Sequence, residues 1–205
     1  LVTRHDLVLI SDEVYAALAF GAPHLSPASL PGMAARSAVV SSLSKSHAMT
    51  GWRCGWSITP ASLLPALQDL ARAMYFGVAQ FIQDAAVVAL TAGVEDLATI
   101  RNAYARRARL MVEMLAGVPG LGSRAPEAGM YIFLDVRGTG LSGKVFAARL
   151  LDETGVAVTP GEGFGPSGAG HVRITLGTEE DRLAEACRRI AGFCRSLRPI
   201  PSGRP

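Results

Sequence analysis

Three short, continuously apolar segments in the first third of the chain restrict its fold more than any other feature. They cover residues 7–11 (LVLIS), 38–43 (AVVSSL) and 54–59 (CGWSIT). A strand that is buried on both faces has no polar alternation, so its sequence takes this form. Helical patterns follow at 61–75 and 79–92. Strands that occur together with helices in this way predict an α/β sheet covered on both sides.

The rest of the chain predicts a second layer, of α+β type. Apolar residues near helical spacing, from Leu97 to Leu115, predict a long helix that begins at Glu95. Later strands are expected at 130–136, 156–159 and 171–176, and later helices at 142–154 and 179–197. We therefore expect two domains, residues 1–93 and 94–198, with the long helix bridging them and a disordered tail at 199–205.

The beginning of the chain affects how the first domain is interpreted. The sequence starts without a Met and enters its first apolar strand by Leu7. A three-stranded parallel sheet with no preceding element would leave long strand edges open. We therefore expect further strands upstream of residue 1, which would make residues 1–93 part of a larger domain.

The composition is typical of a soluble globular protein, with 49% hydrophobic and 18% charged residues among 205. No apolar run reaches the length of a membrane span, and we expect no signal peptide. The 20 basic and 17 acidic residues give a net charge of +3. The basic cluster of Arg106, Arg107 and Arg109 fits a solvated helix face. Neither a membrane nor a nucleic acid is therefore an expected partner.

The three cysteines predict neither disulfides nor a metal site. Cys54 stands in a strand-like run, and Cys187 and Cys194 stand on one helical pattern. Disulfide frameworks and metal sites have other spacings. We therefore expect reduced thiols, a cytoplasmic location and no bound metal. Trp52 and Trp56 are expected in the core.

Four short stretches contain the residues suited to chemistry. Asp12 and Tyr15 follow the first strand, and Ser42 and Lys45 follow the second. Arg53 comes eight residues after the lysine, and Arg173 stands in the last strand. Ligands of open α/β sheets bind beyond the carboxyl ends of strands, which is where Asp12, Tyr15 and Lys45 fall. Each residue alone has an ordinary structural interpretation, as a surface lysine, a helix cap or a salt-bridge partner.

Together these stretches resemble the class I and II aminotransferases, enzymes of pyridoxal-phosphate (PLP) fold type I. The motif reads Ser42-x-Ser44-Lys45-x-x-Ala48-Met49-x-Gly51-x-Arg53-Cys54-Gly55. Cys54 stands where the family usually has an aliphatic residue. The resemblance extends over the whole chain. It implies the C-terminal part of a large PLP-binding domain, with a mixed, mostly parallel sheet, followed by a smaller α+β domain.

The resemblance also implies roles for the residues that bind the cofactor. Lys45 would bond to the PLP aldehyde and then carry the proton between the substrate Cα and the cofactor. Asp12 would pair with the pyridine nitrogen and keep it protonated. Tyr15 would hydrogen-bond the phenolic oxygen of the ring. Ser42 and Arg53 would hold the phosphate, the arginine through its planar set of donors.

Further residues are assigned to the substrate by the same resemblance. Arg173 would bind the substrate α-carboxylate through two parallel hydrogen bonds. Tyr131 would line the substrate pocket, or be a core aromatic of its strand. Residues 160–165 (PGEGFG) are similar to the mobile loop that the family places over its site, and equally to a plain glycine-rich turn. His47, two residues after the lysine, is expected to pack or face solvent.

The substrates are indicated by closer similarity within the family. Residues 26–33, 41–53 and 81–86 are similar to bacterial arginine–pyruvate aminotransferases. This implies arginine as amino donor and pyruvate as the 2-oxo acid acceptor. It also implies a homodimer whose subunits share the active site.

Three alternatives remain open. A PLP-dependent C–S lyase on the same scaffold would use Lys45, Asp12 and Arg173 equally well. An aminotransferase-like sensor domain of a transcription regulator would have a helix-turn-helix upstream. The chain could also be a truncated product, and we expect these 205 residues alone to be inactive.

Overall fold

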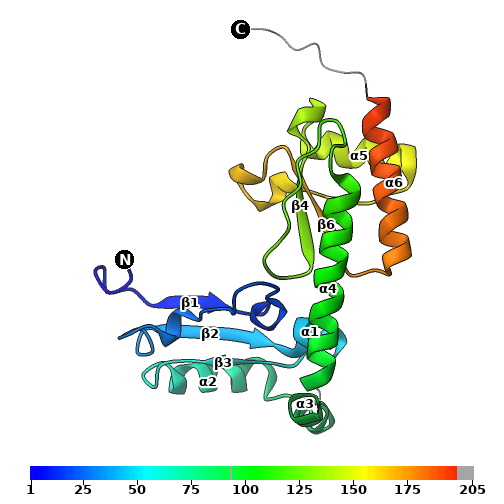
Figure 1. Ribbon diagram of the computed structural model, residues 1–205. Coiled ribbons are helices and arrows are strands. Elements are labelled where there is room, and N and C mark those ends of the chain that lie inside the picture. Colours follow the sequence, from blue (N-terminus) through cyan, green and yellow to red (C-terminus); the bar gives the residue numbers. More distant parts are fainter. Residues whose placement is uncertain (93, 198–205) are drawn as a thin grey trace. The chain divides into compact units, whose positions relative to one another are not determined.

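The computed structural model describes residues 1–92 and 94–197, which divide into two compact units (Figure 1). Unit one is Leu1–Asn102 and unit two is Ala103–Pro205, so the division falls within helix α4 (Val94–Leu115). The boundary predicted at Gly93 and the tail predicted at 199–205 lie outside the described residues. Each unit has a sheet of its own.

The sheet of unit one is three-stranded, in the order β1-β2-β3. Its strands are β1 (Leu9–Asp12), β2 (Ser37–Ser42) and β3 (Gly55–Ile58), close to the three apolar segments of the sequence. β1 runs parallel to β2, whereas β3 runs antiparallel to it, so the sheet is mixed. The connection from β2 to β3 contains only the short helix α1 (Leu43–Ser46) and the 3-10 turn η3 (Thr50–Trp52), and the chain returns beside β2.

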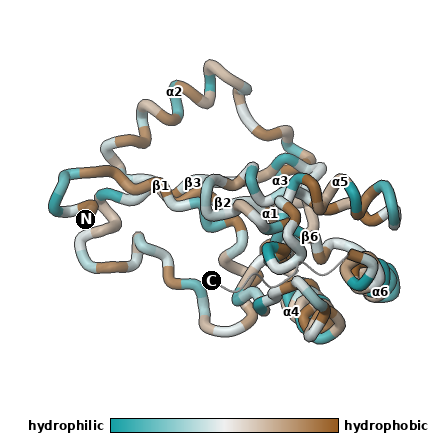
Figure 2. Tube along the Cα trace, turned by 90° about the horizontal axis from the view of Figure 1, so that it is seen from above, coloured by the Kyte–Doolittle hydropathy of each residue, from teal (hydrophilic) through white to brown (hydrophobic). Residues whose placement is uncertain are grey.

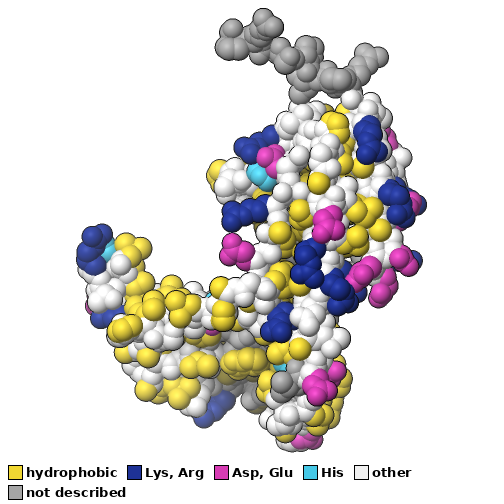
Figure 3. Space-filling view, in the orientation of Figure 1, with side chains coloured by type: hydrophobic (Ala, Val, Ile, Leu, Met, Phe, Trp, Pro, Cys, Tyr) yellow, Lys and Arg dark blue, Asp and Glu magenta, His cyan; other side chains and the backbone are white. Residues whose placement is uncertain are grey.

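The helices of unit one do not cover this sheet on both sides, so that prediction was wrong for this chain. Helices α2 (Leu64–Tyr75) and α3 (Gln80–Ala92) form where the sequence predicts them, and apolar residues recur along α2 (Figure 2). Nevertheless α2 has no buried residue, and β3 is exposed along its whole length. Hydrophobic side chains consequently gather on the surface of this unit (Figure 3).

The two tryptophans also differ from expectation. Trp52 is 42% exposed and Trp56 is 41% exposed, so neither belongs to the core. The physical reason is that Trp56 lies on β3, an edge strand with no further strand beside it among the described residues, and Trp52 lies on the turn before it. A side chain on an edge strand is covered on fewer sides than one on a central strand.

The core of unit one lies at the carboxyl ends of β1 and β2. Leu18, at the end of the 3-10 turn η1 (Ala16–Leu18), and Leu43, at the start of α1, are both completely buried. The turn η1 packs against α1. Burial of a leucine side chain contributes roughly 1.5–3 kcal/mol. These two leucines therefore hold the segment after β1 against the segment after β2.

Unit two contains an antiparallel sheet with the order β4-β6-β5. Its strands are β4 (Tyr131–Asp135), β5 (Thr159–Pro160) and β6 (His171–Thr175). Its helices, besides the end of α4, are α5 (Gly143–Thr154) and α6 (Glu180–Ser196). The strand predicted at 156–159 shortens to the two residues of β5, and the remaining elements agree with prediction to within two residues.

Side chains of β4 and β6 alternate between two faces, as the strand period requires. One face is the core, where Ile132, Leu134, Val172 and Ile174 are buried. Helix α5 packs against β6 and against α6. The opposite face bears partly exposed polar and aromatic side chains, including Arg173 and Tyr131. The sequence of this sheet therefore separates a packing face from a face available to ligands.

The three cysteines are all free thiols, as predicted. Cys187 and Cys194 lie on the buried side of α6, and burial raises the pKa of each thiol to about 11. Since the thiolate is the reactive form, these two residues are unreactive core side chains. No helix within the described residues is long and apolar enough to cross a membrane.

Candidate active site

The parallel pairing of β1 and β2 brings the predicted residues of unit one to one edge of the sheet. Asp12 is the register partner of Val40, and the Glu13 N–H donates to the Val40 carbonyl at 2.9 Å. The chain then turns, because the Asp12 carboxylate accepts a hydrogen bond from the Val14 N–H at 3.2 Å. Tyr15 follows as the residue that precedes η1. The Asp12–Tyr15 turn therefore lies beside the end of β2.

Lys45 lies on α1, immediately beyond the end of β2. The Ser42 hydroxyl caps this helix by accepting a hydrogen bond from the Ser44 N–H at 3.3 Å. The buried Ser46 hydroxyl donates to the Ser42 carbonyl at 3.4 Å. It also lies 2.8 Å from Nδ1 of His47, which is half-buried. These contacts bond the short helix at both ends, and Lys45 lies between them.

Arg53 enters the same region from the turn before β3. Its backbone is left-handed, with a φ of 53°, and its guanidinium donates to the Thr50 carbonyl at 3.0 Å. The turn η3, which precedes it, packs against α1. The other guanidinium donors of this exposed residue are available for an anion. Arg53 also borders a pocket lined by Gly55, Tyr75, Gly77, Val78, Ala79 and Ile82.

A largely covered carboxylate beside Asp12, that of Glu13, was not assigned from the sequence. Oε1 of Glu13 accepts a hydrogen bond from the Ser26 hydroxyl at 2.6 Å, and Oε2 lies 3.2 Å from Nε2 of His24. Burial raises the pKa of Glu13, but hydrogen bonds from Ser26 and Ser11 and the nearby His24 outweigh it and lower the pKa overall. Glu13 therefore anchors the loop after η1, while Asp12 remains exposed at the sheet edge. The only signal in the sequence was the Asp-Glu pair at the strand end.

Arg173 lies in unit two, on the central strand β6. Its guanidinium carbon is 4.3 Å from the centroid of the Tyr131 ring and 4.8 Å from that of the Phe164 ring. No ion pair within the described residues involves Arg173. Aromatic faces attract a guanidinium without occupying its N–H donors. The arginine is thus held in place while its donors remain available to a carboxylate.

Near Arg173, Phe133 was not assigned from the sequence, and Phe164 was predicted only as part of the 160–165 segment. Phe133 is the register partner of Arg173 across β4 and β6. Its ring meets the Phe164 ring edge-on, at 5.9 Å between centroids, and stacks on His171 at 5.0 Å. These contacts depend on the pairing of distant segments, so no local pattern would have shown them.

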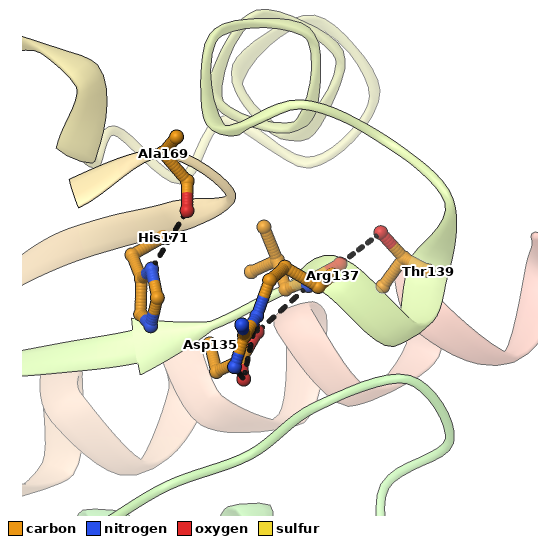
Figure 4. A network of polar contacts seen from close by, with 6 residues as sticks. Asp135, Arg137, Thr139, Ala169 and His171 are labelled. Atoms are coloured by element: carbon orange, nitrogen blue, oxygen red, sulfur yellow. Dashed lines mark hydrogen bonds and ion pairs between the residues drawn. The ribbon is translucent and has the colours of Figure 1, made fainter. Parts of the chain in front are cut away.

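A second arginine in this unit is engaged by a carboxylate of its own (Figure 4). Nε of Arg137 lies 3.0 Å from Oδ1 of Asp135, and its Nη2 lies 2.6 Å from Oδ2. The hydrogen bond from Arg137 is the main reason that the pKa of Asp135 falls to about 2. Arg137 is therefore satisfied internally, in contrast to Arg173.

The glycine-rich segment at 160–165 contains the 3-10 turn η5 (Gly161–Phe164), and a second 3-10 turn, η6 (Pro166–Gly168), follows it directly. Oε1 of Glu162 accepts a hydrogen bond from the Lys144 N–H, in the first turn of α5, at 3.3 Å. Hydrogen bonds from its own N–H and from those of Lys144, Gly143 and Gly170 outweigh burial and lower the pKa of Glu162. This contact was not predicted, since the two segments lie 18 residues apart.

The donor sets of the two units differ in chemistry. Unit one presents a carboxylate, a phenol, an amine, hydroxyls and a guanidinium near the end of β2, whereas unit two presents Arg173 between aromatic rings. Among residues 1–92 and 94–197, no group of three or more His, Cys, Asp or Glu could hold a metal ion. The residues of unit one fit a ligand that carries an anionic group and can react covalently with the lysine amine. Arg173 of unit two fits a ligand carboxylate.

Comparison with known proteins identifies the family of this chain. The family model for aminotransferase class I and II matches residues 1–190. The chain is 55% identical to arginine–pyruvate transaminase AruH of Pseudomonas aeruginosa, over 93% of this chain and 49% of that protein. It is 37% identical to the putative aminotransferase YugH of Bacillus subtilis, over 93% and 49%. The chain spans about half the length of the curated relatives it matches.

A solved structure gives the same result. The aromatic aminotransferase from Pyrococcus horikoshii superposes with a TM-score of 0.91 at 38% identity, over 95% of this chain and 52% of that one. A TM-score of this size, at this identity, reflects the same fold rather than a shared local motif.

Proposed function

The chain belongs to the class I and II aminotransferases, and on that premise we propose that the protein transfers an amino group between an amino acid and a 2-oxo acid. Enzymes of this family depend on PLP. The observation that carries the proposal is the arrangement of Asp12, Lys45 and Arg53 around the end of β2. It gives a carboxylate, an amine and a guanidinium on three neighbouring segments.

The residues of unit one fit PLP by their donor set. Asp12 is exposed beyond β1, and Lys45 is half-buried on the short helix α1. The Arg53 guanidinium donates one hydrogen bond, to the Thr50 carbonyl, and has donors left for a phosphate. When bound, PLP supplies an electron sink for the bonding electrons released at the substrate Cα.

Each residue then has a distinct task. Lys45 holds the cofactor covalently and moves the proton at the substrate Cα. The Asp12 carboxylate keeps the ring nitrogen protonated, because a negative charge nearby favours the charged form. The Tyr15 hydroxyl hydrogen-bonds the phenolic oxygen of the ring. Ser42 and Arg53 bind the phosphate, where a charge-assisted hydrogen bond from arginine is the strongest contact.

Arg173 and Tyr131 serve the substrate. The guanidinium binds the α-carboxylate in a two-pronged pair, supported by its lack of a carboxylate partner within the described residues. The Tyr131 ring, 4.3 Å from the guanidinium carbon, lines the substrate pocket. This assignment favours Arg173 over Arg137, whose guanidinium is paired with Asp135 through Nε and Nη2.

We propose arginine as amino donor and pyruvate as acceptor, supported by the 55% identity to the arginine–pyruvate transaminase. Unit one would correspond to part of the large PLP-binding domain and unit two to the smaller domain. The protein would act in the cytoplasm as a homodimer. A subunit partner that completes the site is supported only by family membership.

A donor screen at fixed pyruvate tests the proposal on the natural protein. Arginine should be the best donor, and alanine should form without release of ammonia. If aspartate or an aromatic amino acid is preferred by tenfold or more, the substrate assignment is wrong. If an amino acid with a C–S bond gives a thiol, ammonia and a keto acid in the absence of pyruvate, the reaction is a lyase reaction and not a transamination.

A further inference from the structure

The turns at 161–168 pack so closely against neighbouring segments that no side chain would fit at three glycines, Gly143, Gly161 and Gly168. A Cβ on Gly143 would lie 2.7 Å and 3.0 Å from the carboxylate oxygens of Glu162, and against the His171 carbonyl. A Cβ on Gly161 would lie 2.6 Å from the same carbonyl and against that of Gly168. A Cβ on Gly168 would in turn meet the carbonyl of Gly161. Only glycine allows such close approaches, so this loop packs tightly against β6 and α5.

The Glu162 carboxylate is the polar contact that joins this loop to α5. The first N–H groups of a helix have no partner within the helix. In α5 they are divided between two side chains: Ser142 accepts from the Val145 N–H at 3.3 Å, and Glu162 accepts from the Lys144 N–H at 3.3 Å. Ser142 is local to the helix, whereas Glu162 comes from the loop. Both side chains cap the same helix turn, but only Glu162 also joins the loop to that turn.

Phe164 follows two residues after Glu162, in the same 3-10 turn. Its ring lies 4.8 Å from the guanidinium carbon of Arg173 and packs edge-on against Phe133. The side chain is 49% exposed, so packing against the core does not hold it. Its position depends instead on how the turn η5, which contains both Glu162 and Phe164, packs against its neighbours.

We propose that Glu162 is a positioning residue for Arg173, which acts by holding the turn that places Phe164 over the guanidinium. The inference rests on the proposed function, in which Arg173 binds the substrate carboxylate. Contact with the Tyr131 and Phe164 rings restricts the rotation of the guanidinium and reduces its exposure to water. A guanidinium held in one orientation loses less conformational entropy when it forms a two-pronged pair.

The kinetic test compares Glu162→Ala, Phe164→Ala and Ser142→Ala in the natural holoprotein. For the first two variants we expect KM for L-arginine to rise about tenfold, because an ordered contact to the guanidinium is lost. The maximal rate and the PLP content should stay unchanged, since neither residue is assigned to the cofactor. Ser142→Ala removes a cap from the same helix turn without touching the loop, and it should leave KM unchanged. Glu162→Gln, which keeps one acceptor oxygen, should recover most of the loss.

A second measurement does not depend on activity. Phenylglyoxal modifies accessible arginines, and mass spectrometry of the digested protein gives the rate at each site. The rate at Arg173, relative to the exposed Arg109 on α4, should increase several-fold in Glu162→Ala and Phe164→Ala and not in Ser142→Ala.

Each outcome decides the inference. Equal effects of Glu162→Ala and Ser142→Ala on KM and on reactivity would mean that Glu162 only stabilises α5. An effect of Phe164→Ala without an effect of Glu162→Ala would mean that the turn stays in place without the carboxylate. If the natural holoprotein without substitutions shows no transamination, the proposed function fails. The reactivity of Arg173 toward phenylglyoxal still tests the positioning role separately.

Discussion

Gly55 and Ser42 face each other across β3 and β2 with no space for a side chain on the glycine. They are register partners, and a Cβ on Gly55 would lie 3.0 Å from Cβ of Ser42 and 2.8 Å from the Ser41 carbonyl. Ser42 caps the helix that carries Lys45, and Arg53 stands two residues before Gly55. This close approach therefore joins the two segments assigned to the cofactor phosphate.

Replacement of Gly55 by alanine should disturb both segments. Forcing a methyl group into this contact should reduce the free energy of unfolding by about 1–3 kcal/mol and weaken PLP binding. Equilibrium unfolding in urea and titration with PLP measure the two effects. Gly51→Ala is the matched control, since a Cβ there would meet nothing within 4 Å. Equal behaviour of the two variants would show that the close approach is unimportant.

Of the two lysines in these 205 residues, Lys45 and Lys144, only Lys45 should form the covalent link to PLP. Lys45 lies on α1 beyond the sheet edge, whereas Lys144 is exposed at the start of α5. Borohydride reduction of the natural protein with PLP, followed by peptide mapping, should find the pyridoxyl group on Lys45. Lys45→Ala should abolish the adduct and Lys144→Ala should retain it. Labelling of Lys144 alone would contradict the assignment.

Arg173→Lys should impair substrate use while leaving the cofactor in place. Lysine keeps the charge but loses the planar, two-pronged geometry, so kcat/KM for amino acids should fall by about two orders of magnitude or more. PLP affinity should change little. Arg137→Lys is the control, because that guanidinium is paired with Asp135 and should not contact the substrate. Equal loss of cofactor and substrate binding in Arg173→Lys would count against the role.

The pair of Asp135 and Arg137 should make stability depend on pH in the acid range. The pKa of Asp135 is lowered from 3.8 to about 2, so its contribution is present above pH 4 and declines as the pH falls toward 2. Because Arg137 is largely exposed, solvent screens the ion pair and we expect its contribution to stability to be small. Urea unfolding at pH 5 and pH 2 should show that Arg137→Gln lowers the free energy of unfolding at pH 5 and that this difference becomes smaller at pH 2. A difference that is the same at both pH values would exclude the ion pair as its cause.

Residues 1–205 expressed alone should show no measurable transamination. Ile10 on β1 is 74% exposed and Ile58 on β3 is 64% exposed, so both edges of the first sheet present apolar side chains to solvent. Catalysis requires groups held to within about half an ångström, and open apolar edges favour aggregation. Addition of PLP, arginine and pyruvate tests this directly. Turnover near the roughly ten per second of an ordinary enzyme would contradict the expectation.

The sequence alone determined the secondary structure around the candidate site, because the determinants there are local. Continuous apolar runs predicted β1, β2 and β3, and the strand-end position of Lys45 followed from its motif. Ser42 caps α1 because its hydroxyl accepts a hydrogen bond from the N–H of Ser44, only two residues later in the sequence. Interactions of this range can be inferred from spacing, and the same holds for the long helix α4.

Only the tertiary structure decided which side chains meet across distant segments. The contact of Glu162 with the start of α5, and of Phe164 with Arg173, depends on how loops are seated on strands. The burial of Glu13 and the exposure of Trp56 could not be predicted either, since the same residue types occur buried and exposed. A side chain's burial is set by the neighbours that the fold brings to it, and a linear sequence does not contain those distances.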